Sequence, residues 1–306
     1  MPDSQTQLDE LHTLRDFLRL AVSRFNQVEL VYGHGTDNAY DEAAFLVLEG
    51  LHLPIDNLEP FLDARLLAAE KQRLAALIDA RVTTRKPLPF LLNKAYIQGV
   101  PFYVDERVIV PRSYIGELMA DGMLAGNGES LIPDTAAIES VLDLCTGSGC
   151  LAILAAMRFE NAQVCAADLS KDALEVAEIN VSKLVPDGRV RLFHGDLFAP
   201  VAGKKFDLII ANPPYVAEAE TAAFEPEYRA EPPMAHVSGA DGFDLTRRIL
   251  RQAAAHLTDG GLLICEIGTG RDLLAEEFPD LPFLWLDTEF SEGEVFALTK
   301  DALAGI

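Results

Sequence analysis

The chain has 306 residues, of which 25 are Lys or Arg and 48 are Asp or Glu, so its formal net charge at pH 7 is −23. This balance argues against a protein that holds a nucleic-acid backbone, because such binding depends on clustered basic side chains. Hydrophobic residues make up 49% of the chain, which provides for a sizeable core and excludes an acidic disordered protein. A length of this order predicts two domains.

The first residues and the cysteines predict a cytoplasmic protein. Residues 1–4 contain neither a basic nor an apolar segment, so no secretory signal is expected. No apolar stretch is long enough to span a membrane, and no membrane association is expected. The cysteines form no C-x-x-C pair and lie in or beside apolar segments, which predicts reduced, mostly buried thiols at Cys145, Cys150, Cys165 and Cys265.

Apolar residues in the first part of the chain recur at helical spacing. One helical face would carry Leu8, Leu11, Leu14, Phe17, Leu18 and Val22. The pattern recurs over Asp41–Leu51 and Phe61–Ile78, and prolines interrupt it up to Pro87. We therefore predict a helical N-terminal domain over residues 1–90.

Residues 91–110 have a different pattern. Aromatic and β-branched residues in Ala95–Ile97 and Phe102–Val104 flank a turn predicted at Gly99–Pro101, and Arg107–Val110 follows. This arrangement predicts a β-hairpin. We interpret it as a connector between two domains.

From residue 111 onward, predicted strands alternate with helices. The strands expected are Val141–Cys145, Gln163–Ala167, Arg189–Phe193, Phe206–Ala211, Gly261–Ile267, Phe283–Leu286 and Val295–Thr299. The clearest helices are Leu151–Arg158, Asp172–Leu184 and Leu245–His256. Such alternation predicts a doubly wound α/β sheet. Only the turn-like residues 287–294 separate the last two strands, which favours an antiparallel pair at the sheet edge.

The first predicted strand of this sheet runs into a glycine-rich turn and a helix. The residues are Val141–Cys150, with Thr146, Gly147, Ser148 and Gly149 in the turn. Glycines allow a positive φ and close approach of a ligand to the backbone. The helix N-terminus that follows offers free N–H groups.

An acid, Asp168, ends the second predicted strand, 21 residues after Gly147. A carboxylate at this place can accept both ribose hydroxyls of a nucleoside. The glycines together with Ala152 also satisfy G-x-G-x-x-A, so a nicotinamide-dependent dehydrogenase remains an alternative, as does a turn without a ligand. Asp143 within the first strand favours a methyltransferase, where such an acid positions the methionine part of S-adenosylmethionine.

A third candidate site follows the third predicted strand, at residues 193–198. Asp196 can accept the exocyclic amine of an adenine, with Leu197 or Phe198 against the ring. The alternative is a simple turn acid. His194 is interpreted as a strand-end residue rather than a catalyst, because the sequence offers it no partner.

The fourth strand leads directly into Asn212-Pro213-Pro214-Tyr215. Proline cannot continue a central strand, and Pro213 restricts Asn212 to an extended conformation, so the chain forms a stiff turn where α/β sheets bind ligands. The Asn212 side-chain oxygen and the Pro213 carbonyl can each accept one N–H of a planar amine or amide. Two such bonds orient the nitrogen and stabilise developing positive charge, and Tyr215 can stack on the planar group.

Together these motifs resemble the HemK-like protein-(glutamine-N5) methyltransferases, over nearly the whole chain. The resemblance implies a Rossmann-like class I S-adenosylmethionine-dependent methyltransferase domain over residues 111–306, with a seven-stranded, mostly parallel sheet and a C-terminal antiparallel strand. Residues 1–90 would recognise the substrate. The residues expected to bind the cofactor are Asp143, Thr146, Gly147, Ser148, Gly149, Asp168, Leu169, Asp196, Leu197 and Asn212. Asn212, Pro213 and Tyr215 would be catalytic, and no metal is expected.

The segment Phe102–Ser113, followed by Ile115–Leu118, points to the branch that modifies ribosomal protein L-three of the large subunit. It is similar to that branch's P-R-S-P-I-x-E-L signature, although Tyr114 stands where the branch usually has proline. Cys145, where most methyltransferases have glycine, also suits this branch. The resemblance implies substrate contacts from Asn212, Pro213, Pro214, Tyr215, Arg112 and Glu117.

The predicted reaction is methyl transfer from S-adenosylmethionine to the N5 nitrogen of a glutamine in ribosomal protein L-three. The alternatives are the same reaction on peptide chain release factors and methylation of nucleic-acid adenine N6 or cytosine N4. The acidic charge argues against the last, because a flipped base needs a basic groove for its backbone. Residues 111–306 carry −18 of the charge. They would attract a free basic ribosomal protein and repel assembled RNA, so no direct nucleic-acid binding is expected.

Overall fold

The structure, a computed structural model, describes residues 9–125 and 130–306. Leu8, counted above in the first apolar face, lies outside these residues. The chain divides into two compact units. One comprises the chain up to Lys94 together with residues 224–230, and the other comprises residues 95–223 and 231–306. Among the described residues, no helix is both long enough and apolar enough to cross a membrane.

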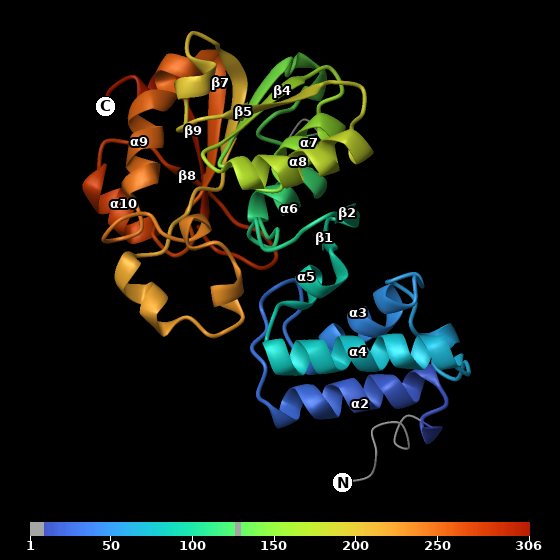
Figure 1. Ribbon diagram of the computed structural model, residues 1–306. Coiled ribbons are helices and arrows are strands. Elements are labelled where there is room, and N and C mark those ends of the chain that lie inside the picture. The colour runs from blue at the N-terminus through green and yellow to red at the C-terminus, as the bar shows by residue number, and fades with distance from the viewer. Residues whose placement is uncertain (1–8, 126–129) are drawn as a thin grey trace. The chain divides into compact units, whose positions relative to one another are not determined.

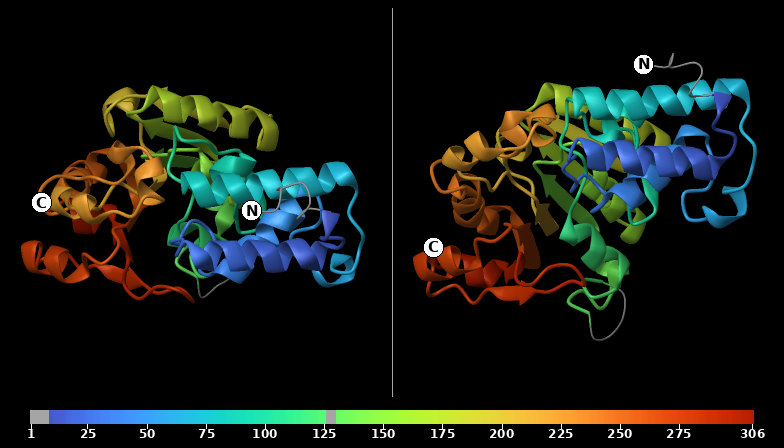
Figure 2. Two further views of the ribbon diagram at one scale, coloured as in Figure 1. Left: turned by 60° about the horizontal axis from the view of Figure 1, so that its bottom comes forward. Right: turned by 90° about the horizontal axis from the view of Figure 1, so that it is seen from below.

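The first unit, which we call the helical unit, is built from α2 (Leu14–Gln27), α3 (Ala39–Gly50), α4 (Ala68–Thr84), α5 (Leu88–Leu92) and the 3₁₀ turn η1 (Glu59–Phe61). Helices α2 and α4 lie side by side (Figures 1 and 2). Helix α2 begins at a capping box in which Thr13 and Asp16 bond each other's backbone N–H. Its buried face repeats at helical spacing through Leu14, Phe17, Leu18, Ala21 and Phe25. The first three of these were predicted, whereas the predicted Val22 is only half-buried and Leu11 lies before the helix.

The predicted helix Phe61–Ile78 is wrong at its start, because α4 begins only at Ala68. The residues just before α4 form hydrogen bonds to the segment that precedes α2, in place of helical hydrogen bonds among themselves. The amide of Leu66 donates to the carbonyl of His12 at 2.9 Å, and Arg65 bridges to Thr13. These bonds satisfy the backbone groups that a longer helix would have used.

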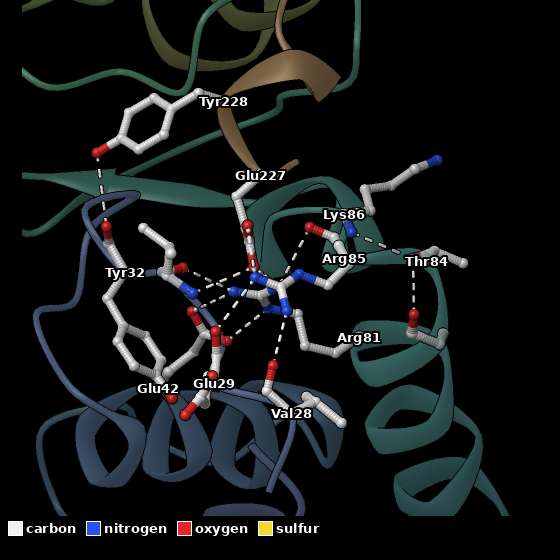
Figure 3. A network of polar contacts seen from close by, with 12 residues as sticks. Val28, Glu29, Tyr32, Glu42, Arg81, Thr84, Arg85, Lys86, Glu227 and Tyr228 are labelled. Carbon is white, nitrogen blue, oxygen red and sulfur yellow. Dashed lines mark hydrogen bonds and ion pairs between the residues drawn. The ribbon is translucent and has the colours of Figure 1, made fainter. Parts of the chain in front are cut away.

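A buried ionic network holds residues 224–230 in the helical unit (Figure 3). Arg81 has no exposed side-chain surface, and its Nε donates to Glu42 Oε1 at 2.6 Å. Its Nη1 lies 3.4 Å from Oε1 of Glu227, which is also fully buried. Arg85 donates to the same Glu227 carboxylate at 3.1 Å, and the amide of Val31 donates to it at 3.1 Å. Two carboxylates thus face two guanidinium groups, which satisfies the charges that burial would otherwise penalise.

The second unit, which we call the α/β unit, contains a seven-stranded sheet in the order β5-β4-β3-β6-β7-β9-β8. The strands are β3 (Ser140–Leu144), β4 (Gln163–Asp168), β5 (Val190–His194), β6 (Phe206–Ala211), β7 (Leu257–Glu266), β8 (Leu284–Leu286) and β9 (Val295–Thr299). The sheet is parallel except for β9, which runs antiparallel between β7 and β8. The predicted doubly wound sheet with a C-terminal antiparallel strand is therefore confirmed.

Helices cover both faces of this sheet (Figure 1). One apolar core packs α6 (Tyr114–Ala120), α7 (Cys150–Arg158) and α8 (Lys171–Leu184) against it. The opposite core packs α9 (Asp244–Ala253), α10 (Arg271–Glu277) and α11 (Lys300–Leu303). The unit also contains short 3₁₀ turns, η2 (Thr135–Ala137), η3 (Ala199–Val201), η4 (Glu218–Ala223), η6 (Pro233–Ala235) and η7 (Ala254–His256), while η5 (Tyr228–Ala230) belongs to the helical unit.

The predicted hairpin forms, but its turn lies elsewhere. Strands β1 (Ala95–Ile97) and β2 (Val100–Phe102) pair antiparallel, so Gln98 and Gly99 make the turn rather than Gly99–Pro101. Both turn residues have positive φ, as a two-residue hairpin turn with the right twist requires. Phe102–Val104 is therefore not the second strand as predicted, and Arg107–Val110 forms no strand.

We expect Glu227→Ala to lower the free energy of unfolding of the helical unit by about 3 kcal/mol, because it removes one partner from a buried ion pair. The matched control is Glu225→Ala, which removes an exposed carboxylate from the same segment and should change stability by less than about 0.5 kcal/mol. Hydrogen exchange of the α3 and α4 amides in increasing urea measures both values. Equal effects of the two substitutions would contradict the role given to Glu227.

Candidate active site

The glycine turn joins β3 to α7 at the carboxyl edge of the sheet. Cys145, Gly147 and Gly149 all have positive φ, at 58°, 55° and 80°. A Cβ on Gly149 would lie 3.2 Å from the Ala177 side chain, whereas a Cβ on Gly147 would have no other atom within 4 Å. Gly147 therefore leaves open space beside the backbone, as close approach of a ligand requires. The conformation of Cys145 is one that glycine adopts more easily, which explains why glycine suits this position.

Hydrogen bonds to two carboxylates hold the glycine turn in place. Asp143 accepts from the Thr146 hydroxyl and from the amide of Ala152. Asp168 accepts from the amide of Gly147 at 2.8 Å with Oδ2 and from that of Ser170 at 2.8 Å with Oδ1. Each oxygen of Asp168 keeps a further lone pair for a ligand hydroxyl.

Asp143 has an unusual environment for a carboxylate. It is fully buried, and its Oδ1 has no hydrogen-bond partner among the described residues. Burial raises the pKa of Asp143 to about 7. An unsatisfied buried oxygen beneath an open glycine turn fits a site built for a ligand that carries positive charge, as the methionine part of S-adenosylmethionine does.

Of the residues in the predicted adenine site, one is exposed and two are buried. Asp196 is exposed, and its Oδ2 accepts from Arg248 at 2.6 Å. Leu197 is buried, and so is Phe198, whose ring stacks on His256 with centroids 4.6 Å apart. Leu169, which follows Asp168, is instead 56% exposed. It is an exposed apolar side chain at this edge, of a kind that can cover a flat ring.

The second half of the site is the turn after β6. The side-chain nitrogen of Asn212 donates to Glu266 Oε1 at 3.1 Å and to the carbonyl of Arg112 at 3.4 Å. Pro213 is buried and Pro214 half-buried, and neither has an N–H, so both offer only a carbonyl.

Two glycines hold Tyr215, which follows these prolines. A Cβ on Gly268 would lie 2.8 Å from Cε2 of the Tyr215 ring, and one on Gly242 would lie 2.3 Å from the Tyr215 carbonyl oxygen. Burial raises the pKa of Tyr215, so the phenol stays protonated at neutral pH. The ring is therefore fixed against a position that only glycine can occupy.

Glu266, at the end of β7, accepts several hydrogen bonds in this region. It is buried, and its Oε2 accepts from the Ser113 hydroxyl at 2.6 Å and from the amide of Tyr114 at 3.0 Å. Burial raises its pKa to about 7. Sequence reasoning missed its contact with Asn212, and the one available signal was its place at the carboxyl end of a parallel strand.

The two predicted substrate contacts before and within α6 have partners in the protein. The Arg112 guanidinium makes two hydrogen bonds of 2.9 Å to Glu231, which also accepts from the amide of Val110 at 2.7 Å. Glu117 accepts from the amide of Glu289 at 2.8 Å. Arg112 thus reaches Asn212 through its backbone carbonyl rather than its guanidinium. The contribution of Glu231 was missed, because 119 positions separate it from Arg112.

Comparison with known proteins identifies the family. A family model described as Methyltransferase small domain matches residues 129–225. A protein of Bradyrhizobium diazoefficiens named ribosomal protein uL3 glutamine methyltransferase is 60% identical over 94% of this chain and 90% of its own length. A protein of the same name from Burkholderia pseudomallei is 50% identical over 96% of both chains. This chain belongs to the ribosomal protein uL3 glutamine methyltransferase family.

Membership confirms the predicted HemK-like resemblance and makes the chain a methyltransferase, for which the family implies S-adenosylmethionine as methyl donor. The fold agrees with that of a solved catalytic domain. The catalytic domain of hMettl16 matches 86% of this chain and 90% of its own with a TM-score of 0.50 and 15% sequence identity.

We expect Gly268→Ala to slow methyl transfer by this methyltransferase at least about tenfold, because the added Cβ displaces the Tyr215 ring. Gly203→Ala is the matched control, since Gly203 also has a positive φ but a Cβ there meets nothing within 4 Å. Both substitutions should cost about 1 kcal/mol of stability through backbone strain. Initial rates and thermal unfolding separate the two effects, and equal rates for the two variants would count against a fixed Tyr215 ring.

Asp143 should also make stability fall as pH rises. Its carboxyl has a pKa of about 7 when folded and an ordinary value of 3.8, so between these values the folded protein binds more protons than the unfolded chain. The free energy of unfolding then decreases with pH, by up to about 1.4 kcal/mol per pH unit. Asp143→Asn should make this slope shallower in urea unfolding at pH 5, 6 and 7, while the part of the slope that is due to Glu266, whose pKa burial also raises to about 7, should remain. An unchanged slope would show that Asp143 is not the titrating group.

Proposed function

We propose that this methyltransferase transfers a methyl group from S-adenosylmethionine to the side-chain amide nitrogen of a glutamine in ribosomal protein uL3. The observation that carries the proposal is the turn after β6, whose Asn212 and Pro213 offer acceptors to a planar NH₂ group beside the glycine turn. The names of the relatives that are 50–60% identical along nearly the whole chain support uL3 as the substrate.

The glycine turn and the acids around it would hold the cofactor. S-adenosylmethionine, when bound, supplies an activated methyl group on a sulfonium. Asp168 would accept from the ribose hydroxyls, Leu169 would cover the adenine ring, and Asp196 would accept from the adenine amine. Asp143 has no exposed surface, so it would act through the turn that it holds and through its charge beneath the methionine part of the cofactor. The turn residues expected to line this site are Thr146, Gly147, Ser148 and Gly149, with Leu197 beneath it.

Asn212 and Pro213 would orient the glutamine amide. An amide nitrogen is a poor nucleophile, because its lone pair is delocalised into the carbonyl. Two hydrogen bonds from its N–H groups, to Asn212 Oδ1 and to the Pro213 carbonyl, would aim the nitrogen and stabilise positive charge as it forms. Tyr215 would pack against the planar amide, and Pro214 would border it. Transfer would leave S-adenosylhomocysteine as the product, and the methylated nitrogen, which then carries positive charge, would lose one proton to water. Because the donor is already activated, no strong general base is needed.

The remaining predicted contacts concern the protein substrate. Glu117 and Arg112 border the same edge, and residues 1–90 would recognise uL3, with residues 91–110 joining this part to the catalytic residues 111–306. We further propose that free uL3 is the substrate form, because an acidic enzyme attracts a basic protein before RNA covers it. Mass spectrometry of ribosomal proteins and release factors from a deletion strain tests the substrate. Loss of one methyl group from a uL3 glutamine supports the proposal, and loss from a release factor would replace it.

Two substitutions should separate binding from transfer. Asn212→Ala should lower the rate of methyl transfer at least about a hundredfold, because it removes one oriented acceptor, while leaving the affinity for S-adenosylmethionine within about threefold. Asp168→Ala should instead weaken S-adenosylmethionine binding about tenfold or more, since a hydrogen bond to a charged group is lost. Calorimetry and initial rates with purified uL3 measure both. Retained turnover in Asn212→Ala would exclude the role given to Asn212.

A further inference from the structure

The orientation of the Asn212 side-chain amide is fixed by what surrounds its nitrogen. An amide has two N–H donors and one carbonyl oxygen. Both donors of Asn212 are used inside the protein, one toward Glu266 Oε1 at 3.1 Å and one toward the carbonyl of Arg112 at 3.4 Å. Rotating the amide by half a turn would set its oxygen against two acceptors. Only one orientation therefore satisfies the amide, and it leaves Oδ1 for other donors.

Glu266 can hold Asn212 in this way because its other oxygen is also occupied. Its Oε2 accepts from the Ser113 hydroxyl at 2.6 Å and from the amide of Tyr114 at 3.0 Å. Both groups belong to the start of α6, where Ser113 is the N-cap and Tyr114 the first helical residue. The carboxylate thus joins the helix N-terminus to the turn after β6. In its ionised form, the carboxylate of a glutamate accepts at both ends and donates at neither.

We propose that Glu266 is a positioning residue for methyl transfer, which fixes the Asn212 amide so that its Oδ1 accepts from the substrate nitrogen. This inference rests on the proposed function, because it assigns Asn212 the same substrate. Glu266 itself touches neither substrate nor cofactor in this role. It acts by excluding the amide orientation in which Asn212 would present an NH₂ group to another NH₂ group.

The isosteric substitution Glu266→Gln tests this arrangement, because it replaces one acceptor with a donor. If the new carbonyl faces Asn212, the new NH₂ meets the amide N–H of Tyr114. If the carbonyl faces Tyr114, the NH₂ meets that of Asn212. Asn212 can relieve the second conflict only by rotating, which removes the acceptor from the site.

A second substitution should rescue the first. Tyr114 occupies the first position of α6, where proline is well accepted, and proline has no N–H. Ser113 before it is already extended, at φ −162° and ψ 130°, as a residue before proline must be. In the Tyr114→Pro background, the NH₂ of Glu266→Gln can face the Ser113 hydroxyl, which also accepts, and the carbonyl can face Asn212.

Kinetics of the four proteins with purified uL3 provide the first readout. We expect Glu266→Gln to lower kcat about a hundredfold with both KM values within about threefold, as for loss of one oriented hydrogen bond in a transition state. In the Tyr114→Pro background the same change should lower kcat by no more than about tenfold. An equal loss of kcat in both backgrounds, or a change confined to KM, would overturn the inference.

The second readout does not depend on the substrate. With ¹⁵N-asparagine labelling, the side-chain NH₂ signal of Asn212 is the one that disappears in Asn212→Ala. Its hydrogen exchange should be slow in the wild type, at least about tenfold faster in Glu266→Gln, and slow again in the double variant. Unchanged exchange in Glu266→Gln would overturn the inference even if uL3 is methylated. Conversely, this pattern together with no methylation of uL3 would count against the proposed substrate alone.

Discussion

The parallel pairing of four central strands places the central polar groups of the site. Leu144 pairs with Ala167 of β4 and with Ala211 of β6, and Ala211 in turn pairs with Cys265 of β7. Because parallel strands end at the same edge, the residues that follow these four must lie in one row. That row contains the glycine turn, Asp168, Asn212 and Glu266. The pairing of the strands alone therefore brings these residues together at one edge of the sheet.

Buried carboxylates hold several parts of the protein in place, including the residues of the site. Several of the acids behind the charge of −23 are buried, namely Glu42, Glu49, Asp143, Glu227, Glu231 and Glu266. Each of these carboxylates accepts from a backbone amide or faces a basic side chain, as burial of a charge requires. Some of the acidic residues therefore have a structural role inside the protein. Because most of these acids face basic side chains that the net charge already counts, the field outside the protein stays strongly negative.

The sequence predicted best what depends on local pattern. Phe206–Ala211 and Val295–Thr299 form strands with the predicted bounds, because the first apolar run ends at a proline turn and the second ends at Thr299, which caps α11. The glycine turn and the turn after β6 follow from the same reasoning.

The errors arose where distant segments decide. Helix α4 starts late because Arg65 pairs with Thr13. No local pattern could reveal that Glu266 faces Asn212, 54 positions away.

The position of Glu227 in the chain also affects how the protein is made. It is 146 residues beyond Arg81, its partner in the helical unit. Strands β1 to β6 lie between them, so a ribosome must synthesise most of the parallel sheet before this carboxylate emerges. Domains generally fold from the N-terminus as they are made. Here the N-terminal unit is complete only when residues 224–230, which lie within the sequence of the second unit, have been synthesised. Its helices therefore emerge first with Arg81 lacking one of its two carboxylate partners.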